Sequence, residues 1–177
     1  MNPDSNRQGF FFVYICRMLV PYDSLTESAK LWIYPASRKF YKEEVPVIKE
    51  KVEAFVTAWK KEDKEFKASY QFLHDRFIII LAQDDDGQLM NQDIDQLVGF
   101  ILSLQMEYEI ELLDRMNVCF KQGEFVQYKE IKAFKKMLKS KSVSEKTIVF
   151  DNLIQTKEEL EHFWEVPITE SWYNRFL

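Results

Sequence analysis

An uninterrupted run of six apolar residues, Phe77–Ala82, constrains the fold more than any other part of this sequence. The preceding segment, Phe66–Leu73, alternates apolar and polar residues, and His74 and Asp75 form a tight turn between the two segments. Alternation is typical of a strand with one buried face, whereas a continuous apolar run indicates a strand that is buried on both faces. The sequence therefore predicts a β-hairpin whose second strand is central in its sheet and covered on both sides.

Further strand and helix patterns flank this hairpin. A short strand at Lys30–Tyr34 is stopped by Pro35, and a helix follows from Tyr41 to Lys61 with apolar residues at helical spacing. A second helix extends from Asn91 to Tyr108 and leads into a strand at Met116–Phe120. The resulting order, β-α-β-β-α-β, is that of a ferredoxin-like split βαβ core in the α+β class.

The chain continues past this core with an added strand, helix and strand, and with a short C-terminal helix. The predicted segments are a strand at Phe125–Tyr128, a basic helix at Lys129–Ser140, a strand at Thr147–Ile154, and a capping box at Thr156–Glu159 that opens a helix to Phe163. The tail carries Trp172, Tyr173 and Phe176, which we expect to dock on the rest of the protein. Because no linker or repeat interrupts them, residues 18–177 are predicted to form a single α+β domain.

The first 17 residues are interpreted separately from this domain. Their apolar run, Phe10–Cys16, is at the short limit for a signal peptide and lacks both a basic flank and a cleavage motif. Met18 opens a stretch that is typical of a cytosolic start. We therefore interpret residues 1–17 as an upstream over-extension or a disordered arm.

The charge pattern indicates a specific partner, and the cysteine content is typical of a cytoplasmic protein. With 24 basic and 29 acidic residues the net charge is −5, which argues against non-specific binding to nucleic acid or anionic membranes. Two cysteines make no disulfide framework, and no apolar run approaches the ~20 residues of a spanning helix. From Asp84 to Arg115 there are nine acidic residues and one basic residue, whereas Lys121–Lys146 holds eight lysines and three acids. This asymmetry favours a protein partner or a homodimer.

The four glycines exclude several nucleotide-binding and hydrolase motifs. They are too far apart for a P-loop, a dinucleotide-binding loop or a nucleophile elbow, and no cofactor is expected. The turn Asp84-Asp85-Asp86-Gly87 lacks the ligand spacing of an EF-hand, so we interpret it as a solvated turn and expect no metal site.

Large aromatic residues and arginines at the ends of the predicted elements are the candidate binding residues. They could form a pocket through stacking and ion pairs, or they could be core aromatics with partly buried arginines beside them. The candidates are Trp32, Arg38, Arg76, Asp114, Arg115, Trp164, Trp172 and Arg175.

Two alternatives to a simple binding domain stay open. A small enzyme could use Asp114, Arg115 and Cys119, although neither His74 nor His162 is placed to complete a triad and Cys119 is interpreted as a semi-buried structural residue. An RNA-binding module could use the strand around Lys121–Tyr128, which matches the RNP1 pattern incompletely. The lysines of the basic helix form either a solvated face or a docking patch for an acidic partner, including another copy of the chain.

Several segments resemble an uncharacterised family of small Bacteroidetes proteins that are often automatically labelled "ABC transporter ATPase". The segments are SAKLWIYPASRKF (28–40), ELLDRMNVCFKQGE (111–124), TIVFDNLIQTKEELE (147–161) and WEVPITESWYNRFL (164–177), and the resemblance extends over residues 18–177. The chain has no Walker A or LSGGQ sequence, so its residues do not support the ATPase label. The resemblance implies no catalytic residue, and we expect a cytosolic, non-catalytic protein that binds a protein partner or a small ligand.

Overall fold

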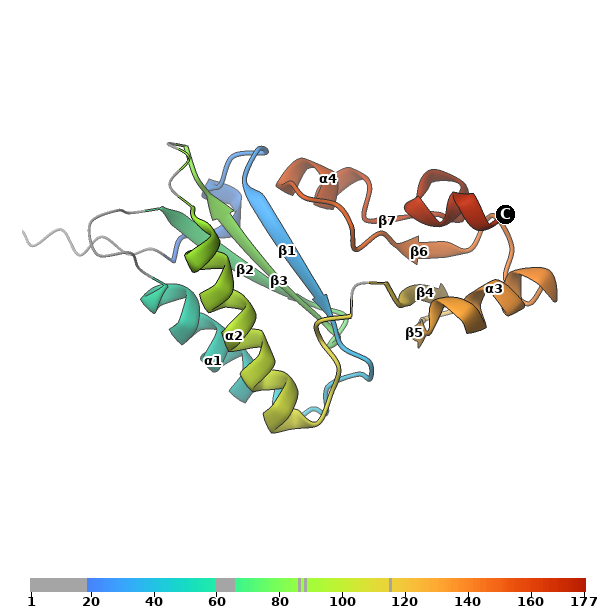
Figure 1. Cartoon of the computed structure of the whole chain (residues 1–177), viewed down its shortest axis with the longest axis horizontal. Coiled ribbons are helices and arrows are strands. Elements are labelled where there is room, and N and C mark those ends of the chain that lie inside the picture. Colours follow the sequence, from blue (N-terminus) through green and yellow to red (C-terminus); the bar gives the residue numbers. More distant parts are fainter. Residues whose placement is uncertain (1–18, 60–65, 86, 88, 115) are drawn as a thin grey trace, which may run out of the picture.

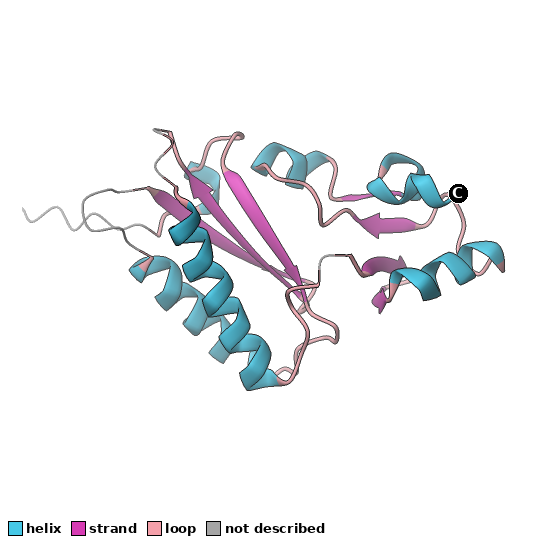
Figure 2. Ribbon diagram, in the orientation of Figure 1, coloured by secondary structure: helices cyan, strands magenta, loops and turns pink. Residues whose placement is uncertain are grey.

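The computed structural model describes residues 19–59, 66–85, 87, 89–114 and 116–177, and the interpretation of residues 1–17 lies outside these ranges. The fold is α+β, as predicted, with two antiparallel sheets and four α-helices among the described residues (Figures 1 and 2). The elements of the first half are β1 (Lys30–Pro35), α1 (Glu44–Ala58), β2 (Lys67–Leu73), β3 (Phe77–Gln83) and α2 (Asn91–Tyr108). Those of the second half are β4 (Val118–Gln122), β5 (Phe125–Lys129), α3 (Ile131–Lys139), β6 (Ile148–Phe150), α4 (Lys157–His162) and β7 (Glu165–Pro167).

The first sheet has the strand order β1-β3-β2, and both pairings are antiparallel. Helices α1 and α2 lie side by side on one face, where the rings of Phe55 and Phe100 stack at 4.3 Å (Figure 1). Ile78, Ile80 and Ala82 of β3 point into the core beneath these helices. The predicted hairpin and the central position of its second strand are confirmed.

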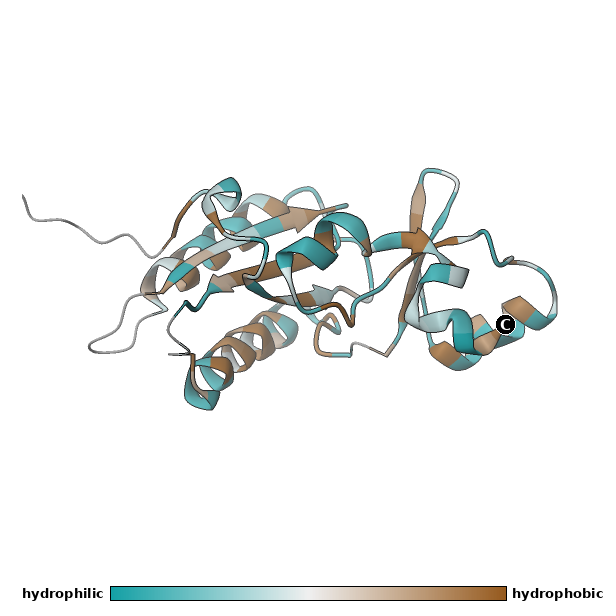
Figure 3. Ribbon diagram, turned by 90° about the horizontal axis from the view of Figure 1, so that it is seen from above, coloured by the Kyte–Doolittle hydropathy of each residue, from teal (hydrophilic) through white to brown (hydrophobic). Residues whose placement is uncertain are grey.

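The opposite face of the first sheet is covered by the second half of the chain. Phe77, Ile79 and Leu81 of β3 belong to a core cluster that also contains Cys119 and Phe150 of the second sheet. Every residue of β3 is therefore buried, as the continuous apolar run predicts. Hydrophobic residues recur along these strands in the view from above (Figure 3).

The second sheet has the order β5-β4-β6-β7, and helix α3 and the C-terminal tail pack on it. The strand predicted at Thr147–Ile154 is shorter in the structure, because the chain turns away at Asp151, whose carboxylate accepts hydrogen bonds from the backbone N–H groups of Leu153 and Trp172. The short strand β7 was not predicted. Tyr173 is buried against α3, which confirms that the tail docks.

Within the described part of the chain, no helix combines the length and the apolar character needed to cross a membrane. The described residues also contain no group of three or more His, Cys, Asp or Glu side chains that could hold a metal ion.

Candidate ligand-binding site

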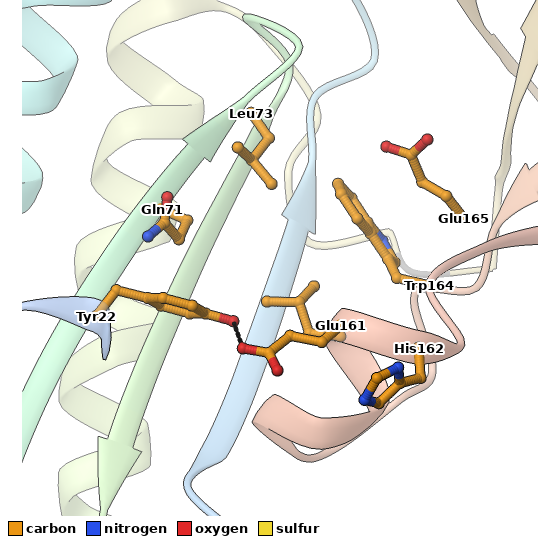
Figure 4. Close-up of a pocket in the computed structure, with 8 residues that line it drawn as sticks. Tyr22, Gln71, Leu73, Glu161, His162, Trp164 and Glu165 are labelled. Carbon is orange, nitrogen blue, oxygen red and sulfur yellow. Dashed lines mark hydrogen bonds between the residues drawn. The ribbon is translucent and has the colours of Figure 1, made fainter. Parts of the chain in front are cut away.

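A pocket of about 380 Å³ lies between the end of β2, the short 3-10 helix Tyr22–Ser24 and helix α4 (Figure 4). This volume is within the range of roughly 300–1,000 Å³ that is usual for small-molecule sites. The lining residues are Tyr22, Gln71, Leu73, Leu160, Glu161, His162, Trp164 and Glu165.

Backbone hydrogen bonds bring the N-terminal wall of the pocket to the sheet. The N–H of Val20 donates to the carbonyl of Ala68 on β2 at 2.9 Å. This bond places the 3-10 helix that follows Val20 beside β2. The ammonium of Lys157, on α4, donates to the carbonyl of Leu25 at 3.0 Å. Together these bonds hold Tyr22 opposite the first turns of α4.

Helix α4 supplies the other wall, and its capping box fixes where the helix begins. The Thr156 hydroxyl accepts from the N–H of Glu159 at 3.3 Å, and the Glu159 carboxylate accepts from the N–H of Thr156 at 3.1 Å. Leu160 and Trp164 then point toward the sheet and Glu161 toward Tyr22 (Figure 4).

A hydrogen bond between Tyr22 and Glu161 closes one end of the pocket. The Tyr22 hydroxyl donates to Glu161 Oε1 at 3.0 Å. Burial raises the pKa of Tyr22, and the neighbouring Glu161 carboxylate raises it further, so the phenol keeps its proton at neutral pH. Lys157 lies 3.7 Å from the same Oε1 atom and 4.6 Å from the centre of the Tyr22 ring. Glu161 Oε2 has no hydrogen-bond partner among the described residues.

The other end of the pocket is bordered by three residues that contact one another, His74, Glu165 and Lys121. His74 Nε2 lies 2.8 Å from Glu165 Oε1, and Lys121 Nζ contacts Glu165 Oε2. Burial tends to raise the pKa of Glu165, but hydrogen bonds from Lys121 and His74 outweigh that effect and lower it. The His74 ring also packs against the Trp164 ring, with centroids 6.0 Å apart. This group links the β2–β3 turn to the second sheet.

The lining residues favour a ligand that carries positive charge and apolar surface. Of the eight, two are carboxylates and none is lysine or arginine. The Trp164 ring can attract a cation through its π electrons, whereas Lys157 already lies over the Tyr22 ring, and Leu73 and Leu160 provide apolar contacts.

The candidate residues from the sequence do not assemble into one pocket. Trp32 packs edge-on against Trp59 on the helix-covered side of the first sheet, with centroids 6.0 Å apart. On the same side, Arg38 forms a two-pronged ion pair with Glu44 at 2.8 and 2.9 Å and donates to the carbonyl of Tyr108 at 3.1 Å. This arginine therefore joins the ends of α1 and α2.

The remaining candidates lie at two further places. Arg76 is buried and donates to the carbonyl of Ala36 at 2.8 Å, and Asp114 accepts from the N–H of Met116 at 2.8 Å. Trp172 and Arg175 lie in the C-terminal tail, with the guanidinium 4.4 Å from the ring centre. Arg115 lies outside the described residues, and only Trp164 lines the pocket beside α4.

Cys119 is fully buried rather than semi-buried, which corrects the sequence interpretation. Burial raises the pKa of its thiol to about 12, and this effect exceeds the opposite influence of Arg76 and of a hydrogen bond with Asn152. At neutral pH the group is a thiol, whereas a nucleophile must be a thiolate.

Sequence reasoning missed Tyr22, Glu161 and Glu165 as pocket residues because no local pattern distinguishes them. One signal was available, since the chain contains only two histidines and both His74 and His162 lie at this pocket. Histidine is the side chain that most readily changes charge near neutral pH, and it is frequent in functional sites.

No family model, curated protein or solved structure matches this chain. The resemblance to the Bacteroidetes family therefore stays a prediction.

Proposed function

We propose that this chain is a cytoplasmic, non-catalytic binding domain that holds a small organic amine in the pocket beside α4. One observation carries the proposal: the pocket is lined by two aromatic rings and two carboxylates, and by neither lysine nor arginine. Glu161 Oε2 is positioned to accept a hydrogen bond from a protonated amine, while Trp164 and Leu73 contact its apolar body.

The non-catalytic part of the proposal is supported by the environment of the sulfur. A nucleophilic mechanism at Asp114, Arg115 and Cys119 requires a reactive thiolate, and burial opposes ionisation of Cys119. RNA stacking on β4 and β5 has less support, because Val126 and Tyr128 pack against the shared core and Phe125 alone is well exposed.

For the fold, we propose that the first sheet and its two helices form a ferredoxin-like split βαβ core without the last strand expected at Met116–Phe120, since β4 pairs in the second sheet. The support is that β1 and β2 flank the antiparallel strand β3 and are connected through α1. The outer edge of β1 is met by an isolated bridge from Lys30 to Thr156, so a segment from the second half of the chain lies beside this core.

A matched set of three small molecules tests the amine site. Benzylamine, benzyl alcohol and benzoate share a phenyl ring and differ in charge, and their binding can be followed by chemical-shift changes in isotope-labelled protein. We expect benzylamine to shift resonances of Leu73 and Trp164 and to bind at least about ten-fold more tightly than the other two, which corresponds to ~1.4 kcal/mol.

Two variants on α4 identify which negative charge increases the affinity for benzylamine. Glu161→Gln keeps an acceptor for Tyr22 but removes the negative charge, and we expect benzylamine to bind about ten-fold more weakly. Glu158→Gln changes an exposed acid that does not line the pocket, and it should leave affinity unchanged. Equal binding of benzyl alcohol and benzylamine, or equal effects of the two variants, would refute the proposal.

A further inference from the structure

Helix α2 presents an exposed apolar stripe on the flank that the sheet does not cover. Val98, Leu102 and Met106 follow one another at intervals of four residues, which places them on one side of the helix. Their exposed fractions are 39%, 42% and 72%. The acidic residues Asp95 and Glu109 bracket this stripe, both are exposed, and neither forms an ion pair with another described residue.

A groove in the basic segment of the chain lies at the far end of the molecule. It has a volume of about 690 Å³ and lies between the end of α3, the following loop and the C-terminus. Leu138, Val143 and Phe176 make its apolar lining, and the exposed residues at its edge are two lysines and one acid, Lys139, Lys141 and Glu145. Within the described part of the chain, neither lysine has a carboxylate within ion-pair distance.

The stripe and the groove are complementary in two respects. Each has an apolar centre, and the stripe is bracketed by two acids whereas two of the three charged residues that line the groove are lysines. Acidic and basic residues are also separated along the sequence, which is strongly acidic from Asp84 to Arg115 and strongly basic from Lys121 to Lys146. Opposite charges at the border of an apolar contact set the orientation of the partners and accelerate their association.

The two surfaces cannot meet within one chain. Helix α2 lies against the first sheet, whereas α3 and the C-terminus lie at the opposite end of the molecule (Figures 1 and 3). A second copy can present its groove to the stripe of the first copy and its stripe to the groove of the first copy. This reciprocal arrangement has two-fold symmetry and therefore closes as a dimer.

We propose that the protein forms a homodimer in which the stripe on α2 of each copy docks in the lysine-bordered groove of the other. The contact is independent of the amine pocket, which involves neither surface. Because each copy contributes one stripe and one groove, the dimer contains two identical contacts. Screening by salt weakens the charged border and should weaken association.

Charge reversal gives a test with an internal rescue, using sedimentation of the full chain over a range of concentrations. The variant Lys139→Glu with Lys141→Glu should dimerise at least ten-fold more weakly, and so should Asp95→Lys with Glu109→Lys, since like charges then face one another. A mixture of the two variants should dimerise again. In the mixed pair one contact has both charges reversed and the other contact is native.

A control with Lys42→Glu and Lys67→Glu reverses two exposed lysines outside the groove and should not change the dimer. Far-ultraviolet circular dichroism establishes that every variant is folded. A chain that stays monomeric up to about 1 mM, or variants that fail to associate when mixed, would overturn the proposal. Open polymers that grow with concentration would also overturn it, because they require contacts that do not close.

Discussion

The carboxylate of Glu165 joins the two halves of the fold at the scale of single residues. Its two oxygens contact His74, in the turn of the first sheet, and Lys121, in the second sheet. Although burial opposes ionisation, these two partners lower the pKa of Glu165 below its usual value of 4.5. Folding therefore favours the ionised carboxylate, and the stability of the protein must depend on pH through this group.

The first prediction concerns Glu165→Gln. A carboxyl group whose pKa is lower in the folded state stabilises the protein above its unfolded pKa, and this contribution is lost as the pH falls through the folded value. We expect the substitution to reduce the free energy of unfolding by about 1 kcal/mol at neutral pH and by less well below pH 4.5. Urea denaturation at neutral and acidic pH measures the difference, and Glu170→Gln, at an exposed position, is the control.

The second prediction concerns the reactivity of Cys119. Because the thiol is fully buried and its pKa is raised to about 12, a disulfide reagent should not modify it in the folded protein at neutral pH. A Cys16→Ser variant leaves Cys119 as the only cysteine, so the absorbance of the released thiol reports on it alone. We expect complete reaction in urea, and rapid reaction without denaturant would contradict the buried placement.

At the scale of elements, the beginning of α4 decides the position of one pocket wall. The third prediction is that Thr156→Ala destabilises the protein by about 1 kcal/mol, because the N–H of Glu159 loses its capping acceptor. Affinity for benzylamine should fall as well, since Glu161 lies on this helix. Thr169→Ala, at an exposed position, should change neither quantity in denaturation and binding measurements. An unchanged affinity with the expected loss of stability would show that the pocket tolerates fraying of the helix.

The elements that could be predicted are those with a strong local pattern. Helix α2 has the predicted bounds, Asn91–Tyr108, because its apolar spacing extends over its whole length. The hairpin of β2 and β3 could be predicted equally well, because one strand alternates apolar and polar residues and the other is continuously apolar. Strand β7 was missed because its three residues are held by pairing with β6, as between Val149 and Val166, and a pairing partner is not visible in a local pattern.

At the scale of the whole molecule, the pocket depends on contacts between distant parts of the sequence. Tyr22 and Glu161, which close one end, are 139 residues apart, and His74 and Glu165 are 91 residues apart. No spacing rule connects such residues, so the candidates chosen from the sequence were large aromatic residues and arginines at element ends. Of these Trp164 alone lines the pocket, because the arginines Arg38 and Arg76 instead bond to nearby backbone and side-chain groups.

The fourth prediction is that the two sheets unfold together. Phe150 of the second sheet packs against Phe77 of the first, with centroids 4.8 Å apart, and both belong to one buried cluster. Removing the ring in Phe150→Ala should cost about 3–5 kcal/mol, whereas Phe163→Ala, at a position that is 54% exposed, should cost far less. Tryptophan fluorescence and far-ultraviolet circular dichroism should give coincident transitions in the unchanged protein. If the transitions separate, the shared cluster does not couple the sheets, because each half then keeps its structure after the other has unfolded.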